Sequence, residues 1–142
     1  MIRNIFYALA ASSLIGLASC SSDNDIEDIY GLWTPIQVDK EKVVMGEAGG
    51  CDTIRLQNYD VWWLSSRTSA RVNDVTVRQI GDSEGKTDTP VSMVGEWFSL
   101  RIPKDNMKLL IINCDPNVSH DKREIEIGVT VGDAFKTLRV VQ

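Results

Sequence analysis

The sequence predicts an all-β domain, a sandwich of two sheets with about eight strands in total. Three observations lead to this prediction. From Tyr30 onward the apolar residues recur with period two, which is the period of a strand. Turn residues interrupt the pattern at the short intervals typical of an all-β chain. Near the C-terminus two alternating segments are joined by Gly132-Asp133, a strong hairpin signal.

The first half of the domain contains short segments with strand character. Pro35 interrupts the first and Gly46 ends the second, which is typical of an edge strand. After Gly50, Ile54 and Leu56 alternate with polar residues, so one face of that strand is expected to be buried. The strands expected here are 34–38 with 42–45, 50–58, 61–64 and 75–80.

The second half begins with an expected loop. Residues 81–89 contain charged and small residues without a large apolar side chain, so we expect an exposed, mobile loop. The run Leu109–Ile112 is continuously apolar and predicts a central strand that is covered on both faces. The strands expected here are 96–102, 107–113, 123–131 and 134–142.

The N-terminus has the character of a targeting signal. A charge at Arg3 precedes an apolar run that is too short to span a bilayer comfortably, since spanning needs about 20 residues. The quartet Leu17-Ala18-Ser19-Cys20 resembles the bacterial lipobox, in which the cysteine thiol is lipidated and becomes the new N-terminus. The alternative is an ordinary secretory signal with an incidental cysteine.

These features divide the chain into three expected parts: a signal peptide at 1–19, a lipidated tether at 20–32 and one domain at 33–142. The tether is acidic, and its acids resemble the signal that follows the lipidated cysteine in surface-exposed lipoproteins of the Bacteroidetes. An acidic segment also serves as a plain solvated spacer. We therefore expect attachment to the outer membrane through lipid on Cys20, with the domain exposed at the cell surface.

The charge balance excludes one class of partner. The chain has 15 basic and 20 acidic residues, for a net charge of −5. Proteins that bind nucleic acid carry basic patches that replace counterions on the phosphates. We therefore expect no nucleic acid partner.

Two cysteines remain if Cys20 carries lipid. Cys51 and Cys114 form an even pair in an exported protein, and a bridge between them would stabilise the fold by roughly 4 kcal/mol. The alternative is two free thiols in the core, where free cysteine is common.

A family resemblance follows from the order of several spaced residues. The chain has Gly49-Gly50 before an alternating strand, then Asn58 shortly before a tryptophan, and it ends on Val140-Val141-Gln142. Over residues 43–142 this order resembles the BACON domain, an immunoglobulin-like β-sandwich of Bacteroidetes surface and secreted proteins. The resemblance implies contact with carbohydrate or mucin, or a spacer role, and the chain departs from it at 68–93. The most distinctive matching positions are Asn113, Asn117, Arg123, Gly132-Asp133 and Gln142.

Catalytic and metal-binding patterns are weak in this sequence. His120 is the single histidine and stands between Ser119 and Asp121 in an expected turn, whereas a catalytic triad is assembled across a fold. Clustered metal ligands are missing from the sequence pattern. We therefore expect no enzyme activity, no catalytic residues, no metal and no cofactor.

Aromatic residues carry the remaining functional signal. A ligand site combines an apolar platform with a few polar groups, and sugar rings stack on flat aromatic faces. Trp62 and Trp63 are neighbours, so in a regular strand one points outward. The alternative is that these rings fill the core, as a tryptophan commonly does in a sandwich. The candidate ligand-binding residues are Tyr59, Trp62, Trp63 and Trp97.

The sequence thus favours a lipid-anchored, non-catalytic binding module of the cell envelope, with a glycan or mucin as its ligand. The alternative is a structural or accessory subunit of an outer-membrane protein complex, which docks through a strand edge or an aromatic face.

Overall fold

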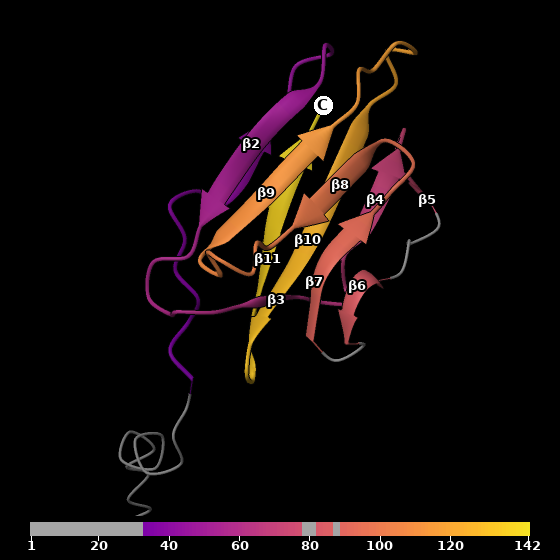
Figure 1. Cartoon of the computed structure of the whole chain (residues 1–142). Coiled ribbons are helices and arrows are strands. Elements are labelled where there is room, and N and C mark those ends of the chain that lie inside the picture. Colours follow the sequence, from indigo (N-terminus) through magenta and orange to yellow (C-terminus); the bar gives the residue numbers. More distant parts are fainter. Residues whose placement is uncertain (1–32, 78–81, 87–88) are drawn as a thin grey trace, which may run out of the picture. The chain divides into compact units, whose positions relative to one another are not determined.

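The structure is a computed structural model that describes residues 33–77 and 89–142, together with the backbone of 82–86 (Figure 1). Residues Trp33–Gln142 form one compact unit. The expected signal peptide, the tether and Cys20 lie outside the described residues. Within the part of the chain that is described, no helix has the length and apolar character needed to cross a bilayer.

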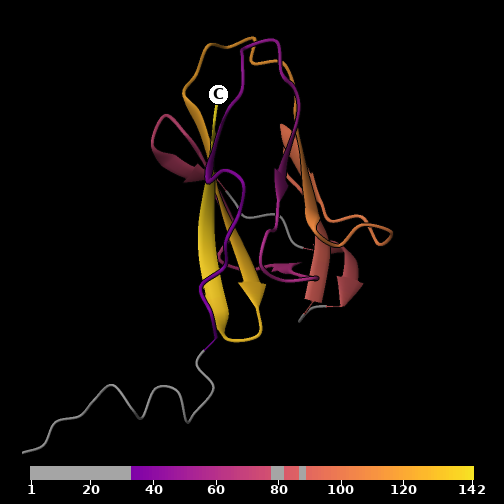
Figure 2. The same ribbon diagram turned by 90° about the vertical axis from the view of Figure 1, so that its left-hand side faces the viewer.

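The domain is an all-β sandwich, as the sequence predicts, with eleven strands in the described residues where about eight were expected. Two sheets face each other, and Figure 2 shows them edge-on. The six-stranded sheet runs in the order β1 (Lys42–Val44), β11 (Ala134–Val141), β10 (Arg123–Val131), β4 (Ser69–Val72) and β5 (Val75–Val77), while β3 (Trp63–Leu64) also pairs with β10. The five-stranded sheet runs in the order β2 (Gly50–Arg55), β9 (Leu109–Cys114), β8 (Phe98–Arg101), β7 (Thr89–Val94) and β6 (Asp82–Lys86).

The alternating pattern of β10 and β11 builds the centre of the six-stranded sheet. Ile125, Ile127 and Val129 are fully buried against the opposite sheet. The strands pair from Glu124 with Val141 down to Val131 with Ala134, so the hairpin closes at Gly132-Asp133 as expected. Gly132 has a φ of +54°, a conformation that glycine adopts without strain.

Strand pairings that the sequence alone did not predict complete the five-stranded sheet. The expected loop at 81–89 is wrong in part: Asp82–Lys86 forms β6, which pairs with β7 as an antiparallel hairpin. β6 lies at a sheet edge, where polar residues are tolerated because one side of the strand is not covered by another strand. Residues 81 and 87–88 lie outside the described residues.

The expected strand at 34–38 is also wrong. This segment makes a single bridge, from Val38 to Leu56, and is otherwise held by the side chains of Asn58 and Tyr59. Asn58 accepts a hydrogen bond from the Gln37 N–H at 2.8 Å and donates one to the Pro35 carbonyl at 2.8 Å. An asparagine that bonds to the backbone in this way takes over the role of a paired strand.

Candidate functional site

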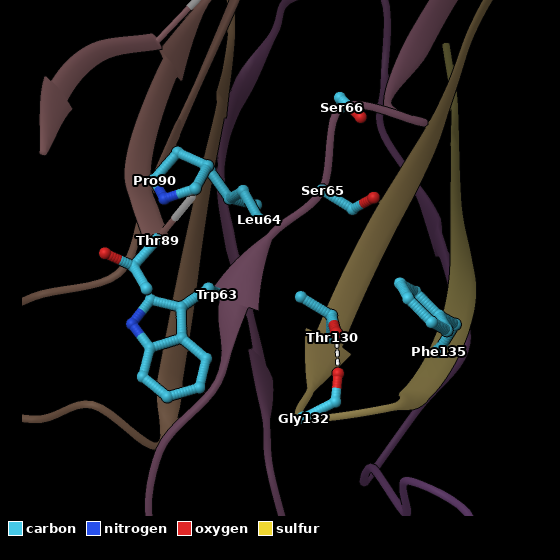
Figure 3. Close-up of a pocket in the computed structure, with 9 residues that line it drawn as sticks. All are labelled: Trp63, Leu64, Ser65, Ser66, Thr89, Pro90, Thr130, Gly132 and Phe135. Carbon is cyan, nitrogen blue, oxygen red and sulfur yellow. Dashed lines mark hydrogen bonds between the residues drawn. The ribbon is translucent and has the colours of Figure 1, made fainter. Parts of the chain in front are cut away.

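A row of three residues crosses the six-stranded sheet near its β10–β11 hairpin. Thr130 on β10 pairs with Trp63 on β3 at one side and with Phe135 on β11 at the other. Residues directly opposite each other in paired strands project from the same face of the sheet. The small Thr130 therefore lies between two aromatic side chains, as Figure 3 shows.

This row borders a cavity of about 430 Å³. That volume falls within the range of roughly 300–1,000 Å³ of small-molecule sites. The walls combine aromatic rings with hydroxyl groups, and the Thr130 hydroxyl donates to the Gly132 carbonyl at 3.0 Å. The lining residues are Trp63, Leu64, Ser65, Ser66, Thr89, Pro90, Thr130, Gly132 and Phe135, and we call this cavity the hairpin groove.

Trp33 extends the aromatic surface beside the hairpin groove. A Cβ atom placed on Gly132 would lie 2.4 Å from the Trp33 ring, so the indole lies directly against this glycine. Trp33 is 48% exposed and lies 6.4 Å, between ring centroids, from Tyr59. The Tyr59 hydroxyl donates to the Thr34 carbonyl, which holds the segment after Trp33 in place.

Two of the four aromatic residues proposed from the sequence are corrected. Trp62 is 0% exposed and Trp97 is 5% exposed, so neither ring is accessible to a ligand. Trp62 points into the sandwich, whereas its neighbour Trp63 is half-buried and lines the groove. Trp97 precedes β8 and packs edge-on against Phe98 with a centroid distance of 5.0 Å. Tyr59 and Trp63 remain as candidates.

The proposed disulfide between Cys51 and Cys114 is wrong, since both cysteines are free. Cys51 pairs with Asn113 across β2 and β9, and Cys114 is the next residue along β9. Successive residues of a strand point to opposite faces, so the two thiols lie on opposite faces of the sheet. Cys51 is exposed, whereas burial raises the pKa of the Cys114 thiol to about 11.

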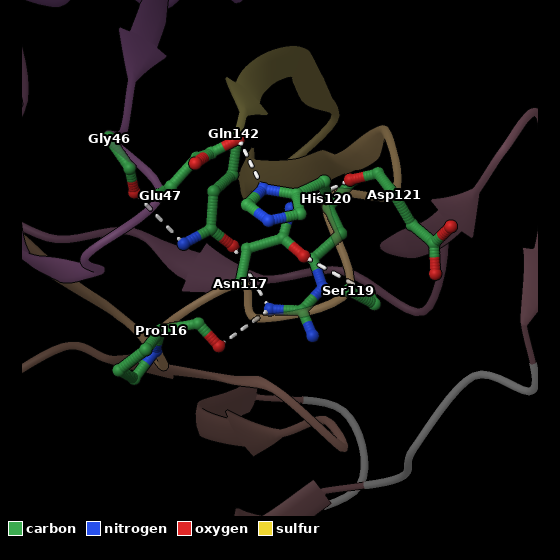
Figure 4. Close-up of polar contacts among 9 residues, drawn as sticks. Gly46, Glu47, Pro116, Asn117, Ser119, His120, Asp121 and Gln142 are labelled. Atoms are coloured by element: carbon green, nitrogen blue, oxygen red, sulfur yellow. Dashed lines mark hydrogen bonds and ion pairs between the residues drawn. The ribbon is translucent and has the colours of Figure 1, made fainter.

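Three of the residues that carried the family resemblance, Asn117, Arg123 and Gln142, gather at the other end of the domain, away from the hairpin (Figure 4). The Gln142 amide donates to the carbonyls of Gly46 and Asp115, at 3.0 and 2.9 Å. Arg123 donates to the Gln142 side chain at 3.2 Å and lies over the Trp97 ring at 5.1 Å. The network joins the chain end to two loops, so its role is structural.

Asn117 and His120 complete this network. Asn117 is buried, and its amide donates to the Asp121 carbonyl at 2.7 Å. His120 is exposed, with its Nδ1 2.9 Å from a Glu47 carboxylate oxygen. The hydrogen bond from Glu47, together with its charge, raises the pKa of His120 above the ordinary 6.5.

The raised pKa makes a small part of the stability dependent on pH. A group with a raised folded-state pKa adds stability that is fully present below its unfolded pKa and is lost as pH rises through the folded pKa. Glu47→Gln should therefore lower the urea midpoint of unfolding near pH 5.5 and leave it unchanged near pH 8.5, which lie on either side of the ordinary histidine range of about 6.5. Glu96→Gln, an exposed acid on another loop, is the matched control. A Glu47→Gln effect that grows with pH would contradict this assignment.

Metal ligands do not gather in the part of the chain that is described: there is no group of three or more His, Cys, Asp or Glu side chains that could hold a metal ion. The chemistry of the hairpin groove thus rests on aromatic rings and hydroxyl groups.

These features define a β-sandwich domain with an aromatic groove beside one hairpin. No protein-family model and no curated protein sequence gives a significant match to this chain. A solved structure described as the NMR structure of the protein from Bacteroides thetaiotaomicron is similar in fold, with a TM-score of 0.58 and 19% sequence identity over 79% of this chain and 89% of that chain. At this identity the similarity shows the fold alone.

Sequence reasoning missed Phe135 and Thr130 as groove residues. The hairpin signal at Gly132-Asp133 already fixed the local register, which places Thr130 opposite Phe135. The hairpin signal could therefore have identified the pairing of Thr130 with Phe135. The other half of the row, Trp63 beside Thr130, depends on a pairing between strands that are far apart in the chain.

Proposed function

We propose that this chain is a lipid-anchored protein of the outer cell envelope, similar to BACON-domain proteins, that binds a glycan without catalysing a reaction. The hairpin groove is the observation that carries the proposal. Its volume suits a few sugar rings, with Trp63 and Phe135 as stacking surfaces and the nearby hydroxyl groups as hydrogen-bond partners.

The side chains of the groove favour binding over reaction. Among the side chains that the structure describes, those lining the groove are apolar, aromatic or hydroxyl-bearing, and none is an acid, amine, imidazole or thiol. Acid–base chemistry requires a titratable group within hydrogen-bond reach of the reacting atoms. The sequence of the N-terminal segment supports the location, through the lipobox-like quartet ending at Cys20.

Phe135→Ala tests this function with little risk to the fold, because Phe135 is 54% exposed. We expect the wild-type protein, purified in detergent, to bind a subset of the glycans on an array of host and dietary polysaccharides. Loss of one stacking surface should weaken the best-bound glycan by roughly three- to tenfold, as measured by calorimetric titration.

The matched control is Val44→Ala, which removes an exposed apolar side chain from the same sheet at the β1 edge. It should leave the affinity unchanged. If the wild-type protein binds no glycan on the array, the glycan-binding function is refuted. It is refuted too if Phe135→Ala binds the glycan with the affinity of the wild-type protein.

A structural role in an envelope complex is the second candidate. The observation that favours it is the exposure of Val44 on β1 and Val75 on β5, the two edge strands of the six-stranded sheet. An exposed edge can accept a strand from a partner. A structural subunit would be recovered from detergent extracts together with another envelope protein, and its assembly would be insensitive to Phe135→Ala.

A further inference from the structure

Most charges on the outer face of the six-stranded sheet are neutralised in pairs. Arg139 donates from Nε to Glu124 at 3.1 Å, and this bond lowers the pKa of the buried Glu124 carboxyl. A second pair on this face is Arg71 with Glu126 at 4.0 Å. Lys136, which lies opposite the buried Val129 and so projects from the inner face, pairs with Glu41 at 2.5 Å. These cations already have anionic partners, which leaves them poorly suited to bind an anionic ligand.

Arg67 differs from these cations. Its guanidinium lies 4.7 Å from the centre of the Phe135 ring, at the rim of the hairpin groove. Among the described residues, no carboxylate forms an ion pair with this group. A guanidinium stacked on an aromatic ring keeps its five N–H donors available around its edge.

The backbone holds Arg67 close to the sheet. A Cβ atom on Gly128 would lie 3.2 Å from the Arg67 Cβ and 3.1 Å from the Ser65 Cβ, so the loop packs tightly over this glycine. The Ser65 N–H donates to the Gly128 carbonyl at 2.8 Å, and the Arg67 N–H donates to the Ser65 hydroxyl at 3.2 Å. These contacts fix the backbone and Cβ of Arg67 beside the groove, and the guanidinium itself lies over the Phe135 ring.

We propose that the hairpin groove binds an anionic polysaccharide, a chain of sugars that carry carboxylate or sulfate groups, and that Arg67 is the anion-binding residue. This inference rests on the proposed glycan-binding function. The planar guanidinium matches carboxylate and sulfate oxygens with two parallel hydrogen bonds. Trp63 and Phe135 provide the stacking surfaces for the sugar rings on either side of Thr130.

The net charge of the chain supports a local cation as the source of any preference for anionic sugars. A net charge of −5 repels a polyanion at long range, so diffuse attraction cannot produce a preference for anionic sugars. A preference for the charged polymer must come from a local group. Among the described side chains, Arg67 is a cation that contacts a residue of the groove lining, Phe135.

The experiment compares two pairs of polymers that differ in charge and share a backbone. Polygalacturonate is set against its methyl ester, and dextran sulfate against dextran, each titrated into the full chain in detergent. The wild-type chain should bind at least one charged polymer about tenfold more tightly than its neutral counterpart. The pair that responds shows whether the anion is a carboxylate or a sulfate.

Arg67→Gln should remove this preference, so that the charged polymer and its neutral counterpart bind with equal affinity. Lys42→Gln is the matched control, because Lys42 is an exposed cation at the far edge of the same sheet. It should alter the affinity less than twofold. Arg67→Lys keeps the charge but loses the two-pronged geometry, so it should restore the preference in part.

The inference is overturned if the preference survives Arg67→Gln, if Lys42→Gln reduces it equally, or if neither charged polymer binds more tightly than its neutral counterpart. If the protein binds neutral glycans on the array without any charge preference, this inference is refuted and the proposed function stands. If it binds no glycan at all, both are refuted.

Discussion

Replacement of Trp62 by alanine should lower the free energy of unfolding by about 3–5 kcal/mol, the range measured when a large buried aromatic side chain is truncated. Trp62 is 0% exposed and belongs to the hydrophobic core between the two sheets. The loss is large against the roughly 5–15 kcal/mol of stability that a typical domain possesses. Urea unfolding followed by circular dichroism measures it without relying on tryptophan fluorescence.

Trp62→Phe should cost less than half as much. The indole Nε1 of Trp62 has no hydrogen-bond partner among the described residues. A buried N–H without a partner costs about 1–3 kcal/mol, and phenylalanine removes this N–H while it keeps an aromatic ring. Trp33→Ala, at the half-exposed Trp33, is the matched control and should cost much less than Trp62→Ala. Equal losses from Trp62→Ala and Trp33→Ala would show that Trp62 does not fill the core.

The fold was predictable where the information is local. Strand β10 alternates apolar and polar residues over its length, and the glycine-containing turn that follows it fixes its register with β11. The apolar run at 109–112 lies within β9, which is flanked by β2 and β8 as expected. The expected cover on both faces is wrong, because only Leu110 and Ile112 of this run are buried and a sheet of a two-layer sandwich packs on one face.

The fold was not predictable where tertiary pairing decides the structure. β6 has the composition of a loop, and it is a strand because β7 pairs with it. Residues 34–38 have the composition of a strand, but their backbone bonds to the Asn58 side chain instead of to a neighbouring strand. Pairing partners of this kind lie outside any local window, so composition gives the wrong answer in both cases.

The candidate site was predictable in part for the same reason. Alternation shows that Trp62 and Trp63 differ in orientation, but it does not say which of them faces the core. At Trp97 the argument does not apply, because β8 begins only at Phe98. Arg67 carries no motif at all, and its place beside Phe135 follows from a loop packed over Gly128.

Cys20→Ala should convert the protein from a membrane-bound to a soluble form. Each buried methylene contributes about 0.8 kcal/mol, and stable attachment requires two or more acyl chains, so under the proposed lipidation of Cys20 loss of this thiol should remove the anchor. Fractionation of cells that produce each variant, with immunodetection in pellet and supernatant, measures the change. Cys51→Ala is the matched control, since Cys51 is an exposed thiol of the folded domain, and it should remain in the pellet. A Cys20→Ala protein that stays in the membrane fraction would refute lipid anchoring through Cys20.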